Sequence, residues 1–362
     1  MKKFKNLFLR IFVLVLALFV AIFFPMIKLA SGDDLTYIYN TFIGNKSKYN
    51  GIIEVWNIDS FESGTASKLS FLENVGKSFQ KLNKGTYVIV RNLTKGECQN
   101  LLSSGEKPDV ISCSYETFDV IKNYLRVFNR FENLGGVYKN YLNAGKNASG
   151  DLVGLAWCTG FYALISTKVK LEKANKYAED VKLNEIAFNS DYEYKIGKKH
   201  KKSDSLVYGT GGGIMPKNAL LAYNRAGSIQ INDTENELIY KSGYAAYSSF
   251  LSNNATILLG TQRDICRMVK REANGKVSDV IIQKLMNWTD LVQFAFITNF
   301  GDSLRQDYGE KFAKFLTESE NQKVIENIGM FPVIGVFETN YKGVMRDIIL
   351  ENFSDLEVKS IF

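Results

Sequence analysis

The chain has 362 residues, 46% of them hydrophobic, only four prolines and a formal net charge of +7. This composition is that of a folded globular protein and excludes a chain that is mainly disordered or collagen-like. The first 32 residues hold five basic residues and no acidic one, so the remainder carries +7 − 5 = +2. That remainder is too weakly basic for a nucleic-acid-binding protein. At about 100–200 residues per domain, the length predicts about two domains.

The N-terminus has the pattern of an export signal. Residues 11–24 are continuously apolar, follow a basic start and precede Pro25. Their length lies between a signal-peptide core and the ~20 residues of a membrane span, so residues 1–32 are a cleaved signal peptide or an uncleaved signal anchor helix. A lipoprotein box would need a cysteine where Asp33 stands, so we expect no lipid anchor. The chain from Asp33 onward is expected outside the cell, secreted or at the cell surface.

After a polar spacer at residues 33–50, strands and helices alternate. Runs rich in β-branched and aromatic residues predict strands, and apolar residues at helical spacing predict helices. The expected elements are strands at residues 51–56, 87–90 and 109–112 and helices at residues 69–82 and 98–103. This order predicts a parallel sheet with helices on both faces.

A second unit is expected to begin near Gly154. Residues 155–166 form a long apolar stretch with a break at Gly160, which suits a strand that leaves one lobe and enters another. The later strands are expected at residues 255–260 and 290–297. The later helices are expected at residues 216–227, 244–251, 261–273, 312–316 and 324–328, the last of which ends at Gly329. No internal repeat is visible.

The histidine and cysteine content limits the enzyme classes that are open to the chain. Ser/His/Asp and Cys/His systems and HExxH zinc sites need an imidazole, and the single histidine, His200, lies in a lysine-rich run that we expect to be a solvated loop. The four cysteines show neither a CxxC pair nor zinc-ligand spacing. They are Cys98, Cys113, Cys158 and Cys266. We therefore expect no catalytic residue, no metal and no cofactor, and the disulfide state stays open.

Four segments occur in an order and spacing that is typical of one family. They are the opening run at residues 51–64 with the helix end at 78–83, the G-x-x-P-D turn at 105–109, the strand at 255–263, and the helix pair with its G-x-x-P-V turn at 312–333. Together they resemble the extracellular solute-binding proteins, family 1, of ABC importers. The resemblance implies an α/β fold of the periplasmic-binding-protein-like type II, with two lobes, each a mainly parallel sheet flanked by helices, that close on a ligand like a hinge.

The resemblance also implies how the chain divides between the lobes. Residues 51–153 and 290–335 are expected to form the first lobe, and residues 154–289 and 336–362 the second. The segment at residues 168–202 departs from the family because it is short and rich in lysine.

Eight residues are candidates for solute binding, because ligands of open α/β sheets lie beyond the carboxyl ends of the strands or at the lobe crossover. They are Trp56, Asn57, Asp59, Glu62, Tyr115, Trp157, Gln262 and Arg263. Trp56 is either a stacking platform for a sugar ring or a core tryptophan, and Trp157 either contacts the ligand or packs at the hinge. Arg263 either donates to the ligand or pairs with Asp264 or Asp290.

The resulting hypothesis is a monomeric, non-catalytic receptor that captures a small solute, a carbohydrate, and presents it to ABC permease subunits. One alternative is a secreted carbohydrate-active hydrolase that uses the acids Glu54, Asp59 and Glu62. Another is a membrane-anchored sensor or degenerate binding protein that recognises a protein partner. The identity of the solute stays open.

Overall fold

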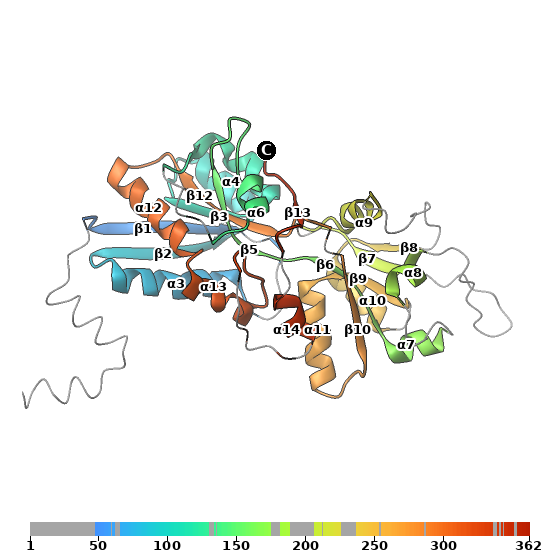
Figure 1. The fold of residues 1–362 in the computed structure, drawn as a ribbon. Coiled ribbons are helices and arrows are strands. Elements are labelled where there is room, and N and C mark those ends of the chain that lie inside the picture. The colour runs from blue at the N-terminus through green and yellow to red at the C-terminus, as the bar shows by residue number, and fades with distance from the viewer. Residues whose placement is uncertain are drawn as a thin grey trace, which may run out of the picture.

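Two α/β units lie side by side in the computed structural model of the chain, and each has its own sheet (Figure 1). The structure describes residues 48–58, 60–61, 66–129, 134, 136–174, 182–188, 206–211, 213–225, 237–252, 255–285, 287–335, 339, 342, 344–350 and 353–362. The predicted signal or anchor segment, most of the spacer and the run around His200 lie outside these residues. Within the described ranges, no helix has both the length and the apolar composition needed to cross a membrane.

The first unit is built on a six-stranded sheet. Its strands are β1 (Gly51–Ile58), β2 (Thr86–Leu93), β3 (Val110–Cys113), β4 (Leu125–Arg126), β5 (Gly154–Thr159) and β12 (Val292–Thr298). The order is β2-β1-β3-β12-β4, with β5 also paired to β12. β1 is parallel to β2 and β3, and β12 alone runs against its neighbours.

Helices complete the first unit. They are α3 (Lys68–Leu82), α4 (Lys95–Ser103), η1 (Tyr115–Thr117), α5 (Phe118–Ile121), η2 (Lys122–Tyr124), α6 (Lys139–Ala144), α12 (Ser303–Phe315), α13 (Ser319–Lys323) and η3 (Ile325–Ile328). α3 begins where Ser67 accepts a hydrogen bond from the Ser70 amide, a normal N-cap. η3 ends at Gly329, as predicted, because this residue adopts a left-handed φ of 72°.

The second unit has a five-stranded sheet in the order β10-β6-β9-β7-β8. Its strands are β6 (Tyr162–Thr167), β7 (Leu206–Gly209), β8 (Glu237–Tyr240), β9 (Ile257–Thr261) and β10 (Val280–Leu285), and the helices along this part of the chain are α7 (Lys168–Lys173), α8 (Leu183–Phe188), α9 (Pro216–Arg225), α10 (Gly243–Leu251) and α11 (Gln262–Ala273). β7 is parallel to β8 and β9, whereas β6 runs against β9 and β10. The prediction of two α/β lobes, each with a sheet flanked by helices, is therefore confirmed, but both sheets are mixed rather than mainly parallel, because β12 and β6 run against their neighbours.

The chain passes from the first sheet to the second at Gly160. β5 is still bonded to β12 of the first sheet, although the predicted boundary put residue 154 in the second lobe, and β6 belongs to the second sheet. The predicted break at Gly160 thus separates two strands, while the lobe boundaries as such stay a prediction. A Cβ on Gly160 would lie only 2.3 Å from Oε1 of Gln262, so a side chain here would displace the Gln262 amide.

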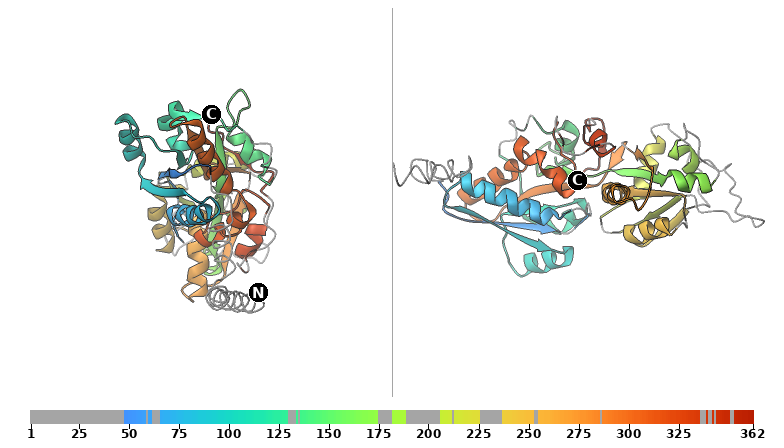
Figure 2. Two further views of the ribbon diagram at one scale, coloured as in Figure 1. Left: turned by 90° about the vertical axis from the view of Figure 1, so that its left-hand side faces the viewer. Right: turned by 90° about the horizontal axis from the view of Figure 1, so that it is seen from below.

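A small two-stranded sheet lies where the chain returns from β10 to β12. It pairs β11 (Trp288–Thr289) with β13 (Glu357–Val358), which follows α14 (Val344–Leu350). The end of the chain therefore lies near the boundary between the units, as both Figure 1 and the view from below in Figure 2 show.

All four cysteines lie in the buried interior, and the structure forms no disulfide among these described residues. Burial raises the pKa of the Cys98 thiol to about 11. A thiol with so high a pKa is protonated at neutral pH and behaves as a small apolar side chain.

Candidate functional site

The two units touch where the loops after β1 and β3 meet the loop between β7 and α9. Gly213 of the second unit adopts a φ of 83°, and a Cβ at this position would lie 3.3 Å from the Phe61 amide nitrogen and 3.4 Å from Oε2 of Glu116. Phe61 and Glu116 belong to the first unit. We call this contact region, together with the side chains of Tyr115, Tyr162 and Asp290 described next, the junction.

Asp290 lies at the centre of the junction, on the connection between β11 and β12. Its side chain is 2% exposed. Tyr162, at the start of β6, donates its hydroxyl proton to Oδ1 of Asp290 at 2.7 Å, and the same hydroxyl accepts a hydrogen bond from the Met215 amide at 2.7 Å. The ring of Trp288 stacks on Tyr162 with a centroid separation of 6.3 Å. The carboxylate is therefore tied to the second unit.

Tyr115 approaches the same carboxylate from the first unit. Neither its hydroxyl nor Oδ2 of Asp290 has a hydrogen-bond partner within the described part of the chain, although both atoms are buried. Burial, followed by the negative charge of Asp290, raises the pKa of Tyr115. Burial likewise raises the pKa of Asp290 to about 7, against the lowering effects of the Tyr162 hydroxyl and of Lys359. The junction thus holds a buried carboxyl group that titrates near neutral pH.

A groove of about 790 Å³ lies beside the junction, between α9 and the segment around β13. It is lined by Asn218, Leu221, Arg225, Trp288, Glu357, Val358, Lys359, Ser360 and Phe362. We call it the junction groove. Lys359 connects it to the junction, because its ammonium lies 4.7 Å from the centroid of the Tyr115 ring. The groove combines an aromatic ring with hydrogen-bonding and charged side chains, as small-molecule sites do.

A chain of buried hydrogen bonds holds the loop after β1 in place. Lys68 Nζ donates to Ser60 Oγ at 2.8 Å, Ser60 Oγ to Gln293 Oε1 at 2.9 Å, and Gln293 Nε2 to Ser112 Oγ at 3.1 Å. Ser112 Oγ in turn lies 3.4 Å from Oδ1 of Asn57. These bonds join α3, β1, β3 and β12, so they fix the part of the loop that touches the second unit.

The predicted candidates Trp56 and Asn57 lie inside the first unit. Trp56 is buried, its Nε1 donates to Oε1 of Glu54 at 2.8 Å, and the Arg91 guanidinium lies 5.6 Å from its ring centroid. Asn57 donates to Oδ1 of Asn92 at 2.6 Å. With its ring enclosed, Trp56 offers no stacking surface in this arrangement of the described residues, and the solute-binding roles of both residues stay predictions.

Trp157 and Gln262 pack at the crossover. The ring of Trp157 stacks on Phe71 at a centroid separation of 5.1 Å, and its Nε1 donates to Ser112 Oγ at 3.2 Å. Gln262 is buried against Gly160, and its Oε1 finds no hydrogen-bond partner among the described residues. Trp157 thus packs inside the first unit, and the solute-binding roles of Trp157 and Gln262 stay predictions.

Arg263 forms an ion pair within α11. Its Nε and one terminal nitrogen each lie 3.2 Å from Oδ1 of Asp264, which is the pairing that the sequence offered as the alternative to ligand binding. Asp59 and Glu62 lie outside the described residues. Of the eight candidates, the described structure brings Tyr115 alone into the junction.

The sequence interpretation did not include Tyr162 or Trp288 among the candidates, and it considered Asp290 only as an ion-pair partner of Arg263. One signal was present: Asp290 directly precedes the largely apolar run of β12, where an acidic side chain is rarely buried unless it is paired. Within the described chain, no group of three or more histidine, cysteine or acidic side chains is placed to hold a metal ion.

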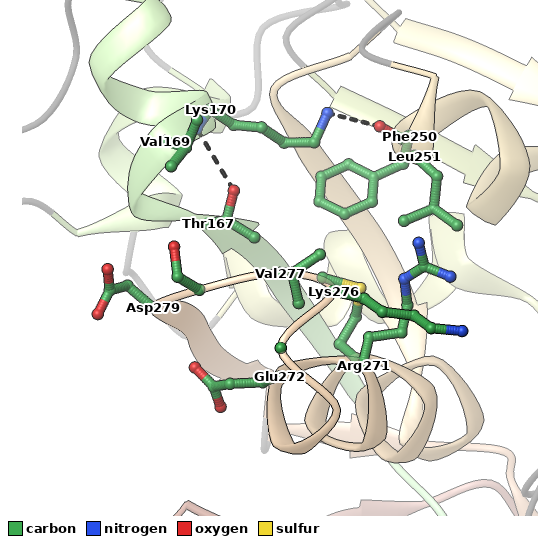
Figure 3. A pocket seen from close by; sticks show the side chains of 13 residues that line it. Thr167, Val169, Lys170, Phe250, Leu251, Arg271, Glu272, Lys276, Val277 and Asp279 are labelled. Carbon is green, nitrogen blue, oxygen red and sulfur yellow. Dashed lines mark hydrogen bonds between the residues drawn. The ribbon is translucent and has the colours of Figure 1, made fainter.

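A second pocket of about 730 Å³ lies in the second unit, between α7, α10, α11 and the loop before β10 (Figure 3). Lys170 donates to the carbonyl oxygen of Phe250, as Figure 3 shows, and to that of Ala255 at 3.2 Å. Burial lowers the pKa of Lys170 to about 8. These bonds tie the end of α10 to the start of α7, so the amino group of Lys170 has a structural role. None of the eight candidates lines this pocket.

Solved solute-binding proteins have a similar structure. A putative oligosaccharide periplasmic-binding protein from Synechococcus sp. MITs9220 matches with a TM-score of 0.58 and 11% identity over 78% of this chain and 77% of that one. Ferric iron-binding protein A from Mannheimia haemolytica, in an open conformation, matches with a TM-score of 0.56 and 12% identity over 81% and 88%. The spermidine/putrescine-binding protein PotD from Streptococcus pneumoniae matches with a TM-score of 0.54 and 12% identity over 79% and 84%.

No protein-family model matches the sequence, and no curated protein matches it. At these low identities the structural similarity shows the fold alone. The chain has the two-lobed type II fold of periplasmic binding proteins, as the sequence predicts. Membership of family 1 stays a prediction.

Proposed function

We propose that the protein is the extracytoplasmic solute-binding receptor of an ABC importer, without catalytic activity. One observation carries this proposal: polar side chains from both units and from their connection meet at the junction, beside a groove, in a two-lobed fold. Such an arrangement allows two lobes to close on a ligand by a hinge. In the proposal the receptor is a monomer, is exported through residues 1–32 and delivers its solute to permease subunits.

The proposed solute is a carbohydrate that binds in the junction groove. A sugar ring has an apolar face and a hydroxylated rim, so it needs an aromatic surface flanked by hydrogen-bonding groups. Phe362, which is 55% exposed, and the edge of Trp288 supply the aromatic surface, and Asn218, Glu357 and Ser360 supply hydrogen-bonding groups. The oligosaccharide-binding protein from Synechococcus is among the structurally similar proteins, which supports this class. Iron and polyamine binders are equally similar in fold, so these solutes belong in the test.

A thermal-shift screen of the purified full chain tests the proposal. Oligosaccharides, ferric iron and spermidine are added separately, and the melting temperature is recorded. A ligand that binds only the folded state adds RT ln(1 + [L]/Kd), about 2.7 kcal/mol at one hundred times Kd, so a sugar should raise the melting temperature by several degrees. A rise with iron or spermidine alone would contradict the sugar assignment, and no rise with any solute would contradict the receptor.

Two variants show whether a bound sugar occupies the junction groove. Phe362→Ala removes the exposed aromatic side chain of the groove and should abolish the sugar-dependent shift. Tyr87→Ala is the matched control, because it also removes an aromatic side chain, but one that is exposed on β2 and lies outside the groove. Equal loss in both variants would show that the sugar binds elsewhere.

A further inference from the structure

Three described aspartates are buried to the same degree but have different partners. Asp109, Asp264 and Asp290 are each 2% exposed. Asp109 and Asp264 are each hydrogen-bonded to an arginine guanidinium, at 2.9 and 3.2 Å respectively. Asp290 is bonded instead to the uncharged hydroxyl of Tyr162. Burying an ionised carboxylate without a bonded cation costs free energy. The burial of Asp109 and Asp264 is explained by their arginine partners, but that of Asp290 is not.

The groups around Asp290 come from several elements of both units. Tyr162 belongs to β6, Tyr115 and Glu116 belong to η1, and Lys359 follows β13. Glu116 and Lys359 act on the carboxyl in opposite directions, and burial is the largest influence. The Lys359 ammonium lies over the Tyr115 ring, from where its charge lowers the pKa of the carboxyl group. The uncharged carboxyl group is therefore the form that this environment favours below about pH 7.

A line of polar contacts crosses the junction through Asp290. It runs from the Met215 amide to the Tyr162 hydroxyl and on to Oδ1 of Asp290. On the other side, Oδ2 and the Tyr115 hydroxyl are both buried and lack hydrogen-bond partners among the described residues. A protonated Oδ2 can donate to the Tyr115 hydroxyl, which completes the line from the second unit to the first. Separation of the units would break this contact and let water reach the carboxyl.

We propose that Asp290 is a proton-dependent latch between the two units: its neutral carboxyl stabilises the closed junction, and its carboxylate favours the open one. The proton comes from solvent on closure and returns to solvent on opening. This inference rests on the proposed function, because it makes retention of the solute at the same junction depend on pH.

The direction of the effect follows from the linkage between proton binding and closure. The closed junction raises the pKa of Asp290 to about 7, whereas a carboxyl open to water titrates near 4. Between these values the closed form binds more protons than the open form. The ratio of closed to open molecules should increase as pH falls from 7 toward 4, by up to about tenfold per pH unit, and should change little above pH 8.

Distance measurements between the units test the latch without any solute. Spin labels are placed at Lys81→Cys on α3 and Lys270→Cys on α11, both exposed positions, in the full chain in detergent micelles. Distances are measured by double electron–electron resonance from pH 5 to pH 8. The population with the shorter distance should increase as pH falls. In Asp290→Asn, whose amide is neutral and can donate to Tyr115, that population should be high at every pH.

Control variants distinguish the latch from the effects of removing any buried carboxylate or of poor folding. Asp264→Asn removes an equally buried carboxylate that is paired inside α11, and it should keep the pH response. Tyr115→Phe keeps the ring under Lys359 but removes the proposed acceptor, so it should reduce the response even if Asp290→Asn folds poorly. A pH-independent distance in the unmutated chain, or an unchanged response in either junction variant, would overturn the latch. A pH-dependent distance in a chain that binds no solute would contradict only the proposed function.

Discussion

The buried carboxyl group of Asp290 also predicts how folding stability changes with pH. Its pKa is raised in the folded state, so the folded protein binds this proton more tightly than the unfolded chain does. Holding the ionised carboxyl group in the folded interior costs free energy. This cost is absent below about pH 4, grows as pH rises and is complete above about pH 7. Asp290→Asn should raise the free energy of unfolding by about 2–4 kcal/mol at pH 8 and change it little at pH 4. Denaturant titrations at both pH values check this, and equal effects at the two would contradict it.

The Asp109–Arg305 pair differs from Asp290, because here the buried carboxylate is bonded to a cation. Asp109 accepts from Arg305 at 2.9 Å and from the Glu54 amide at 2.8 Å. Arg305→Met leaves a buried carboxylate without its cation and should cost about 3–5 kcal/mol at pH 7. Arg91→Met removes the cation of a more exposed pair and should cost less than about 1 kcal/mol. Urea unfolding of the two variants measures the difference, and similar costs would refute the role of burial.

At the scale of single residues, the sequence predicts partners that are near in the chain better than partners that are far apart. The Arg263–Asp264 pair was among the alternatives because the two residues are adjacent. The junction joins Tyr115, Tyr162 and Asp290, which are separated by 47 to 175 positions along the chain. No local pattern indicates which of the many tyrosines meets this aspartate, since the contact depends on the packing of two sheets.

Among the helices, α4 offers a clear test of local stabilisation. The Thr94 side chain accepts from the Glu97 amide at 3.2 Å, and the Glu97 carboxylate accepts from the Thr94 amide at 2.7 Å, which is a capping box. Thr94→Ala removes one of these bonds and should lower the free energy of unfolding by about 1 kcal/mol. Glu97→Gln keeps an acceptor at the same place and should cost less. Thermal unfolding of both variants compares them, and a larger loss in Glu97→Gln would refute the assignment.

The elements that the sequence predicted are those with a strong pattern of their own. The predicted strand at residues 51–56 is β1, and the predicted helix at residues 261–273 is α11 with its N-cap at Thr261. The strands β7, β8 and β10 of the second sheet were not predicted. β7 has only four residues, Leu206–Gly209, which is a short signal although all four are buried. β8 and β10 lie at the edges of the sheet, and β10 is mostly half-buried, so neither has the continuous apolar run or the clean alternation that marks a strand in sequence.

At the scale of the whole molecule, the sequence predicts the fold better than the function. The fold follows from the order of strands and helices, whereas the function depends on individual side chains. Alternating strands and helices with right-handed crossovers allow few topologies, so a two-sheet α/β fold could be predicted. The solute could not, because binders of different solutes share this fold at 11–12% identity. Solute choice depends on side chains that meet between the units, and their meeting depends on how the units pack.

The close contact at Gly213 allows a test of how strongly the packing of the two units depends on one residue. A side chain at this position would be strained by the φ of 83°, at a cost of about 1–2 kcal/mol, and would press against the Phe61 amide nitrogen and Oε2 of Glu116. Gly213→Ala should therefore shift the units apart, lengthen the distance between labels on α3 and α11 and weaken solute binding.

Gly275→Ala is the matched control for this substitution. Gly275 also has a positive φ, 65°, but a Cβ there would meet no described atom within 4 Å. The control should show a similar loss of stability from backbone strain and an unchanged distance between the units. If both alanine variants gave the same distance as the unmutated chain, the contact at Gly213 would not control closure, and the junction would have to be held by its buried polar groups alone.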